Sequence, residues 1–496
     1  MPQLEDINFT VQSRSLLEVD AAEVQRTNPL AKLVHNQRIV EVPELELESG
    51  VTIRNFPIAY KTWGTLNEKG DNCIVICHAL TGSSDVSDWW APLLGKDKAF
   101  DPSRFFIICL NSMGSPYGSF SPLSLNKETG QSYGPEFPLC TVRDDVRAHR
   151  IVLDSLVVSS VACVIGGSMG GMFALEWTVL FGKDYVKNLV ALATSARHSA
   201  WCISWSEAQR QSIYSDPKYL DGYYSFEDPP VSGLSAARMS ALLTYRSRNS
   251  FESKFSRKVP SVSQQQKSGN RSVPDQPISI SEHSVSIHND GNKSQINSQN
   301  FLYKKQGSFS SQSSRESRDC IASASSVTSL SSATAEMKEV KPVQTYFSAQ
   351  SYLRYQGAKF ISRFDANCYI AITRKLDTHD LARARPEYEE DITEVLRSIR
   401  QPSLVIGIKS DGLFTLQEQE FLAEYIPHSH LEKIKSGEGH DAFLLEFELI
   451  NSLIIEFLKK NVKEIMEGEP TEWAGFQGDS FVKNSVFGES EEVTNW

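Results

Sequence analysis

The most informative segment of this 496-residue chain is Val161-Ala-Cys-Val-Ile-Gly-Gly-Ser-Met-Gly-Gly-Met-Phe-Ala-Leu-Glu-Trp177. It opens with an apolar run typical of a strand buried on both faces, and a glycine-rich turn and an apolar helix follow. Gly166, Ser168 and Gly170 fit the pattern G-x-S-x-G, whose glycines permit a strained turn that lifts a serine hydroxyl above the sheet. We therefore predict that Ser168 is a nucleophile; the alternative is an ordinary glycine-rich turn between a strand and a helix.

Similar apolar runs occur on both sides of this segment, with helical patterns between them: Asn72–Cys77, Phe105–Leu110, Leu189–Ala193 and Ser403–Ile408. Continuous apolar runs that alternate with helices predict a parallel sheet with right-handed crossovers. The expected fold class is therefore α/β, a mostly parallel sheet flanked by helices. The alternating segment 40–48 predicts an edge strand that leads into this core.

Composition divides the chain into an N-terminal extension, a split core and a lid. Residues 1–50 form the extension, and residues 51–196 and 396–462 form the two parts of the α/β core. Residues 197–395 are helical in pattern and rich in aromatic residues, and an α/β sheet tolerates such an inserted lid beside its active site. At 256–343 the lid is interrupted by a Ser-rich stretch with few large apolar residues, which predicts a disordered insertion.

Charge and cysteine usage restrict the partners and the compartment. A net charge of -11 would repel phosphate backbones and anionic lipid, so we expect neither a nucleic-acid nor a membrane partner. The basic stretch 246–258 is interrupted by Glu252 and predicts a solvated face. The eight cysteines show no metal-binding spacing, the N-terminus has no apolar signal region, and the acidic tail at 463–496 has no anchor. We expect a cytoplasmic protein without a metal.

A serine becomes a nucleophile when a base takes its proton, and in the α/β-hydrolase fold an acid and then a histidine follow the serine. Asp411 comes directly after an expected strand, at the carboxyl edge of the sheet. His440 lies in a loop between an expected short strand and an apolar helix. These two residues are the predicted partners of Ser168, although each could instead be a surface aspartate or a capping histidine. His78 is a competing base, but it precedes the serine.

The segment His78-Ala-Leu-Thr-Gly-Ser-Ser84 follows the strand expected at 72–77. The backbone N–H groups of Leu80 and Met169 could together hold the oxyanion that develops during acyl transfer. A simple turn explains the loop equally well. The residues themselves thus predict acyl transfer through a serine and leave the acceptor open.

Several runs of the chain resemble the homoserine O-acetyltransferases of the methionine pathway, which are acyltransferases with the α/β-hydrolase fold. The likeness is greatest to the fungal forms, which carry a serine-rich insertion, and it covers nearly the whole chain apart from that insertion. The similar runs are His78–Gly82, Asn111–Gly114, Tyr133–Pro138, Gly166–Met172, Leu234–Met239, Leu243–Arg246, Tyr352–Asn367 and Gly439–Glu446.

The resemblance implies a triad of Ser168, Asp411 and His440, with Arg238 binding the carboxylate of an amino-acid acceptor and Asp441 its ammonium group. A cation for one end and an anion for the other suit an α-amino acid. Without the resemblance, Arg238 would be interpreted as a solvated helix residue. The resemblance also implies acetyl-CoA as cosubstrate, L-homoserine as acceptor, no further cofactor and a homodimer.

The expected reaction is a ping-pong transfer of acetyl from acetyl-CoA to Ser168 and then to homoserine. Three alternatives use the same triad: an esterase or deacetylase with water as acceptor, a serine O-acyltransferase, and a transferase that takes succinyl-CoA. A non-catalytic regulatory protein that recruits partners through the serine-rich insertion is an alternative of another class.

Overall fold

The structure is a computed structural model of the chain, and it describes residues 15–261, 263–264, 280–292, 345–473 and 475. Two units are distinguished, Met1–Ser256 with Tyr355–Trp496, and Arg257–Arg354. Most of the expected disordered insertion at 256–343 lies outside the described residues. Within it, the structure describes one helix that we did not predict, α9 (Ile280–His288).

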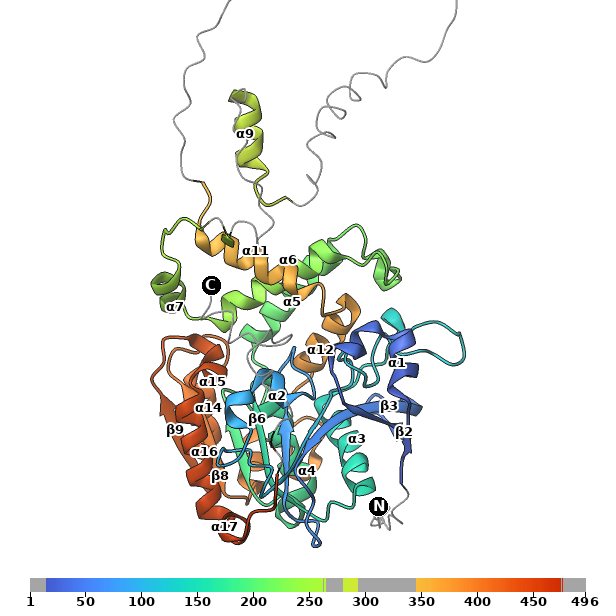
Figure 1. The fold of residues 1–496 in the computed structure, drawn as a ribbon, viewed down its shortest axis with the longest axis vertical. Helices are drawn as coiled ribbons and strands as arrows, with labels where there is room; N and C mark the ends of the chain where they lie inside the picture. The colour runs from blue at the N-terminus through green and yellow to red at the C-terminus, as the bar shows by residue number, and fades with distance from the viewer. Residues whose placement is uncertain (1–14, 262, 265–279, 293–344, 474, 476–496) are drawn as a thin grey trace, which may run out of the picture. The chain divides into compact units, whose positions relative to one another are not determined.

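The first unit is built on a sheet of nine strands in the described residues, in the order β1-β2-β3-β5-β4-β6-β7-β8-β9 (Figure 1). From β5 to β9 all neighbours run parallel, whereas β1, β2 and β3 are antiparallel additions. The strands are β1 (Leu17–Glu18), β2 (Arg38–Glu46), β3 (Thr52–Trp63), β4 (Cys73–Cys77), β5 (Phe106–Leu110), β6 (Val161–Gly167), β7 (Leu189–Leu192), β8 (Ser403–Ile408) and β9 (Ser429–Ile434).

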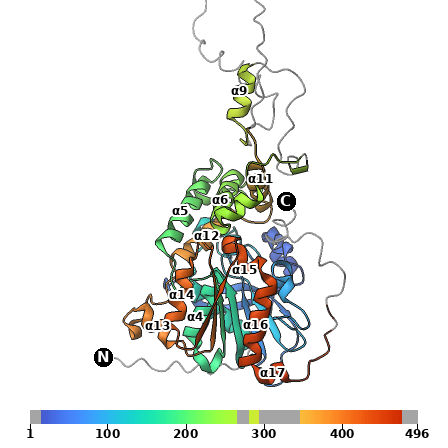
Figure 2. The same ribbon diagram turned by 90° about the vertical axis from the view of Figure 1, so that its left-hand side faces the viewer.

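The parallel strands follow the apolar runs in the sequence. Every residue of β4, β6, β7 and β8 is buried, because helices cover both faces of the sheet. Figure 2 shows α16 on one side and α13 and α14 on the other. The predicted α/β fold with a mostly parallel sheet and an inserted helical lid is confirmed.

Two details at the antiparallel side differ from expectation. The segment 40–48 was predicted to be the edge strand, but β2 lies one place inside, between β3 and the two-residue β1. The long strand β3 was not predicted. Polar residues such as Arg54 and Lys61 interrupt its apolar positions, because only part of each face is buried.

Helices pack on the sheet and form the lid. The core helices are α2 (Val86–Trp89), α3 (Val142–Ser155), α4 (Met169–Tyr185), α14 (Leu416–Tyr425), α15 (Ala442–Leu445), α16 (Phe447–Asn461) and α17 (Lys463–Glu467), with α1 (Ala21–Thr27) near the N-terminus. Between β7 and β8 the chain inserts α5 (Ala200–Tyr214), α6 (Val231–Tyr245), α7 (Arg248–Lys254), α11 (Ser348–Phe360), α12 (Ala366–Asp377) and α13 (Ile392–Ser398). No helix in the described ranges is long and apolar enough to cross a membrane.

A buried ion pair fastens the inserted segment to the core. Lys375 of α12 pairs with Asp145 of α3, and both side chains are at most 1% exposed. The Lys375 ammonium group also donates to Ser112 Oγ and to the Met113 carbonyl, each at 2.7 Å. Asp145 in turn accepts from the Met113 backbone N–H at 2.6 Å. The loop after β5 is thereby held between a core helix and a lid helix.

Candidate active site

Ser168 occupies the sharp turn between β6 and α4, with φ 58° and ψ -127°. Two glycines of the motif make this turn sterically possible. A Cβ atom on Gly166 would lie 2.1 Å from the Gly170 carbonyl oxygen, and one on Gly170 would lie 2.1 Å from the Cys77 carbonyl oxygen. Residues with side chains cannot occupy these positions, so the glycines permit the strained backbone that presents the Ser168 side chain at the end of the sheet.

Ser168, His440 and Asp411 lie within hydrogen-bonding distance of one another in series. Ser168 Oγ is 2.9 Å from His440 Nε2, and His440 Nδ1 is 2.7 Å from Asp411 Oδ2. A neutral imidazole that donates from Nδ1 to Asp411 leaves Nε2 free to accept the serine proton. The structure thus brings together the three residues predicted from different parts of the sequence.

The surroundings hold Asp411 and His440 in place. Asp411 Oδ1 accepts from the backbone N–H groups of Leu413 at 2.8 Å and Phe414 at 3.0 Å, which fixes the carboxylate just beyond β8. The His440 ring packs against Phe414 and Phe443, with centroid distances of 5.4 and 5.3 Å. This buried, largely apolar setting strengthens the hydrogen bonds between the three residues.

His78, the competing base, has a different place. Its Nδ1 lies 2.8 Å from the Ala79 carbonyl oxygen, and its Nε2 accepts from the Ser112 backbone N–H at 2.9 Å. Burial lowers the pKa of His78 to about 4, so the ring is neutral and donates from Nδ1. The Gly82 N–H also donates to the Ala79 carbonyl, at 2.9 Å. Because the peptide bond is trans, the Leu80 N–H points away from the Ala79 carbonyl.

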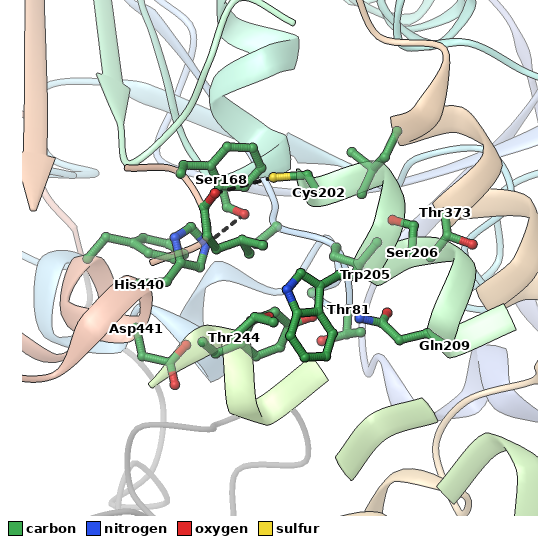
Figure 3. A pocket seen from close by; sticks show the side chains of 18 of the residues that line it. Thr81, Ser168, Cys202, Trp205, Ser206, Gln209, Thr244, Thr373, His440 and Asp441 are labelled. Carbon is green, nitrogen blue, oxygen red and sulfur yellow. Dashed lines mark hydrogen bonds between the residues drawn. The ribbon is translucent and has the colours of Figure 1, made fainter. Parts of the chain in front are cut away.

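Ser168 and His440 open into a cavity beneath the lid helices (Figure 3). Leu80 and Thr81 line it from the loop after β4, and the lid helices α5, α6 and α12 supply another part of the wall. Of the described residues that line the cavity, Asp441 alone is acidic, and none is lysine or arginine.

Asp441 and Arg238, the residues expected to bind an amino acid, differ in their position relative to the cavity. Asp441 lines the cavity and follows His440 in the chain, whereas Arg238 is 1% exposed and does not line it. The Arg238 guanidinium lies 5.5 Å from the ring centroid of Tyr245, which is part of the cavity wall. The alternative of Arg238 as a solvated helix residue is excluded by this burial.

Arg246 is an exception to the predicted solvated basic face at 246–258, in which Arg248, Arg257 and Lys258 are exposed. The Arg246 side chain is 3% exposed, and Nη2 lies 2.8 Å from Glu438 Oε2. Its Nη1 lies 3.9 Å from Asp441 Oδ2. The sequence pattern was misleading because the acidic partners lie almost 200 residues away in the chain. Among the described residues, no three His, Cys, Asp or Glu side chains are gathered as a metal site requires.

Comparisons with known proteins agree with this geometry. A family model described as alpha/beta hydrolase fold matches residues 72–447. The homoserine O-acetyltransferase of Saccharomyces cerevisiae is 71% identical over 490 residues, which cover 99% of this chain and 100% of that protein. The enzyme of the same name from Emericella nidulans is 56% identical and covers 95% of this chain and 97% of its own length.

The chain belongs to the homoserine O-acetyltransferase family.

Solved structures extend the likeness to the fold of this family. The homoserine O-acetyltransferase from Bacillus anthracis has a TM-score of 0.63 at 20% identity, covering 86% of this chain and 98% of that one. Esterase E22 has a TM-score of 0.64 at 21% identity, covering 85% and 99%. At such identities the likeness concerns the fold, which in this family is therefore shared with esterases.

Sequence reasoning missed the part of the cavity wall that α5 contributes. Cys202, Trp205, Ser206 and Gln209 all line the cavity. The last three follow Cys202 by three, four and seven residues, which places all four on one face of the helix. This periodicity was present in the sequence. We did not interpret it because polar residues on a lid helix usually face solvent.

Proposed function

We propose that this member of the homoserine O-acetyltransferase family transfers an acetyl group from acetyl-CoA to the γ-hydroxyl of L-homoserine, and that Ser168 carries the acetyl group between them. The observation that carries the proposal is the 71% identity, over nearly the full length of both chains, to a curated enzyme of that name. The hydrogen-bonded series Ser168, His440 and Asp411 supplies the chemical means.

In the first half-reaction, His440 Nε2 takes the proton of Ser168 as the hydroxyl oxygen attacks the thioester carbonyl of acetyl-CoA. The tetrahedral intermediate collapses, the bond between carbon and sulfur breaks, and the proton on His440 passes to the departing thiolate of CoA. Asp411 stabilises the transient imidazolium through Nδ1. The product is an acetyl ester on Ser168.

In the second half-reaction, homoserine takes the place of CoA. His440 removes the proton of its γ-hydroxyl, and that oxygen attacks the acetyl ester. Collapse of the second intermediate releases O-acetylhomoserine, and His440 returns its proton to Ser168. No cofactor enters this scheme besides acetyl-CoA as cosubstrate.

The N–H groups of Leu80 and Met169 form the oxyanion hole in this proposal. Two observations support Leu80: it lines the cavity beside Ser168, and its N–H points away from an Ala79 carbonyl that accepts from both His78 and Gly82. The assignment of Met169 is supported by its position as the first residue of α4, because the first N–H groups of a helix have no acceptor within the helix. Such donors stabilise both tetrahedral intermediates.

For the acceptor, Asp441 binds the ammonium group and Arg238 attracts the carboxylate. Asp441 is 5% exposed and lies in the cavity wall, where an ammonium group can reach it. Arg238 does not line the cavity, and its guanidinium lies 5.5 Å from the Tyr245 ring centroid, so it acts on the carboxylate through its charge. Removal of the carboxylate from the acceptor should therefore lower its kcat/KM less than removal of the amine does.

An esterase or deacetylase reaction is the alternative that the shared fold suggests, with water in the place of homoserine. The two functions differ in the fate of the acetyl group. With acetyl-CoA and homoserine present, the proposal expects O-acetylhomoserine in equal amount to free CoA. Acetate as the only product would refute the transferase. The same assay with L-serine as acceptor and succinyl-CoA as donor ranks the closer alternatives.

Acetylation of Ser168 is tested by intact mass after mixing the protein with acetyl-CoA alone. We expect an added acetyl group on the unchanged protein and none on Ser168→Ala, whose turnover should fall by about four orders of magnitude or more. Ser204→Ala, on the exposed side of α5, is the matched control and should be acetylated normally. An unmodified wild-type protein would favour the non-catalytic alternative.

A place in methionine biosynthesis follows from the proposed reaction, since O-acetylhomoserine is an activated homoserine. A homodimer and a cytoplasmic location belong to the same proposal and come from the family resemblance. Light scattering of the purified chain measures the first, and a fluorescent fusion in cells measures the second. A monomer at micromolar concentration would contradict the dimer.

A further inference from the structure

One wall of the cavity carries polar groups for which the mechanism above has no use. We call the side chains of Trp205, Ser206 and Gln209 on α5 the donor face. All three line the cavity and share one side of the helix. Figure 3 shows Ser206 and Gln209 across the cavity from Ser168 and His440.

Gln209 is held in one orientation. Its side chain is 5% exposed, and Oε1 accepts from the Tyr369 hydroxyl of α12 at 2.7 Å. This bond commits the oxygen and turns the amide nitrogen toward the cavity, on the side of Thr81 (Figure 3). Within the described part of the chain, Nε2 has no hydrogen-bond partner. Gln209 therefore offers two N–H donors to whatever fills the cavity.

The other two members also lack partners. Ser206 is 6% exposed, and its hydroxyl makes no hydrogen bond to any described residue. The indole Nε1 of Trp205 is buried and is likewise without a partner among the described residues. Buried donors without a partner destabilise a folded protein, and native structures contain few of them. Of the three groups, only the Trp205 Nε1 is fully buried, whereas Ser206 and Gln209 present their donors to the cavity, where a ligand that supplies oxygen atoms can accept from them.

Charge favours a neutral ligand group on the donor face. No lysine or arginine lines the cavity in the described residues, so the face offers hydrogen bonds without a positive charge. A carboxylate gains more beside a cation, and Arg238 is on the Tyr245 side of the wall. An amide carbonyl oxygen needs donors only. Of the two substrates, acetyl-CoA has amide groups along the arm that ends in the thioester, whereas homoserine has a carboxylate.

We propose that the donor face binds amide carbonyl oxygens in the arm of the acyl donor while its thioester lies at Ser168. The inference rests on the proposed function, which supplies the identity of the donor. It assigns Trp205, Ser206 and Gln209 to the first half-reaction and leaves Asp441 and Arg238 to the second. Acetyl-CoA and homoserine thus use different walls of one cavity in turn.

Three variants remove the donors: Trp205→Phe, which keeps an aromatic ring, and the near-isosteric Ser206→Ala and Gln209→Glu, the last of which keeps an oxygen for Tyr369. The first probe is CoA itself, titrated calorimetrically into each variant combined with Ser168→Ala. The second is steady-state kinetics, because in a ping-pong reaction kcat/KM for each substrate reports only its own half-reaction. We expect each variant to weaken CoA binding and to lower kcat/KM for acetyl-CoA by about 5- to 20-fold. The value of kcat/KM for homoserine should stay within about twofold.

Ser204→Ala is the matched control, because Ser204 is exposed on the same helix and its hydroxyl donates to the Ala200 carbonyl at 2.8 Å. It should leave both kinetic constants and CoA binding unchanged, and the Tm of each variant shows that the lid is folded. Unchanged CoA binding in all three variants would overturn the inference, as would a loss confined to homoserine. CoA binding is measured without turnover, so a protein that binds CoA through these residues but transfers no acetyl group refutes only the proposed function.

Discussion

His78 shows how a residue that does not touch the substrate can set the chemistry of the site. Its neutral ring donates to the Ala79 carbonyl and accepts from the Ser112 N–H, so it connects the loops that follow β4 and β5. The Ala79–Leu80 peptide is thereby fixed, and with it the direction of the Leu80 N–H. His78 is in this view a positioning residue for the proposed oxyanion hole.

Replacing His78 should therefore affect the rate more than the binding of substrates. We expect His78→Ala to lower kcat by roughly 10- to 100-fold with little change in KM. A misplaced oxyanion donor stabilises the transition state less, whereas the stability of the bound ground state is unchanged. His78→Asn should recover part of the rate, because its side-chain amide can donate to the Ala79 carbonyl as Nδ1 does.

A merely structural role for His78 predicts a different pattern. It would lower the Tm and the fraction of protein that becomes acetylated, with kcat per acetylated site unchanged in both variants. Counting acetylated Ser168 by intact mass separates the two interpretations. Equal kcat per site in the wild type and in His78→Ala would contradict positioning.

The functional residues that could be predicted from the sequence are those whose role depends on a few adjacent residues in the chain. Ser168 was predicted because the turn around it requires glycine at fixed positions, and Asp411 because it ends an apolar run. His78, in contrast, owes its role to a loop that lies more than 30 residues away, and Arg246 to Glu438 and Asp441. Such contacts exist only after folding.

At the scale of elements, the connection between β6 and α4 tolerates no side chain at Gly166. An alanine Cβ would lie 2.1 Å from the Gly170 carbonyl oxygen, a backbone atom that cannot move away without displacing α4. We expect Gly166→Ala to destabilise the protein by several kcal/mol or to prevent folding, as measured by Tm and soluble yield. Gly437→Ala is the control, because a Cβ there meets nothing within 4 Å. Equal Tm values for both variants would be inconsistent with the structure.

The attachment of α12 to α3 can be tested in the same way. Lys375→Met leaves the buried carboxylate of Asp145 without its cation, which should lower the free energy of unfolding by about 3–5 kcal/mol. Burial already raises the pKa of Asp145, against the opposing effect of Lys375. The double variant Lys375→Met/Asp145→Asn should recover part of the loss, because no unpaired charge remains.

An exposed ion pair is the control for that experiment. Lys433 lies 2.6 Å from Glu420, and both side chains are 42% exposed, so Lys433→Met should cost at most about 1 kcal/mol. Chemical unfolding of the variants gives both values. If Lys375→Met cost no more than Lys433→Met, the buried pair would not hold the lid to the core.

Among elements, the sequence was most informative for strands with both faces buried. Strands β4, β6 and β8 consist almost wholly of apolar residues, so their positions followed from composition. Strand β3 mixes buried and exposed positions and was missed, and the donor face of α5 was missed because three polar residues mark a wall only when a cavity lies beside them. Lys375 and Asp145 were missed because charged residues are rarely buried as a pair.

At the scale of the whole molecule, several histidines are buried in the neutral form. Burial lowers the pKa of His78 and His379 to about 4, and that of His149 and His198 to about 3, from an ordinary value near 6.5. His149 is typical, because burial is the largest effect on its pKa: its ring stacks on Phe173, with the Asn111 carbonyl at 3.4 Å and Asp145 at 3.9 Å, and the charge of Lys375 lowers the pKa further.

These histidines should make the fold sensitive to mild acid. Below pH 6.5 the unfolded chain takes up a proton at each of them and the folded chain does not, so the free energy of unfolding falls as the pH falls toward 4. Each histidine contributes about 1.4 kcal/mol per pH unit in that window, and nothing above pH 7. The raised pKa of Asp145 acts in the opposite direction, so the effect is best isolated by comparison. Urea unfolding at pH 7, 6 and 5 gives the free energy of unfolding as a function of pH. The slope of this plot should be smaller in His149→Gln than in the wild type, by the amount that corresponds to about one proton taken up on unfolding. Parallel curves would mean that His149 titrates normally in the folded protein, which would contradict its burial on α3 against the Phe173 ring.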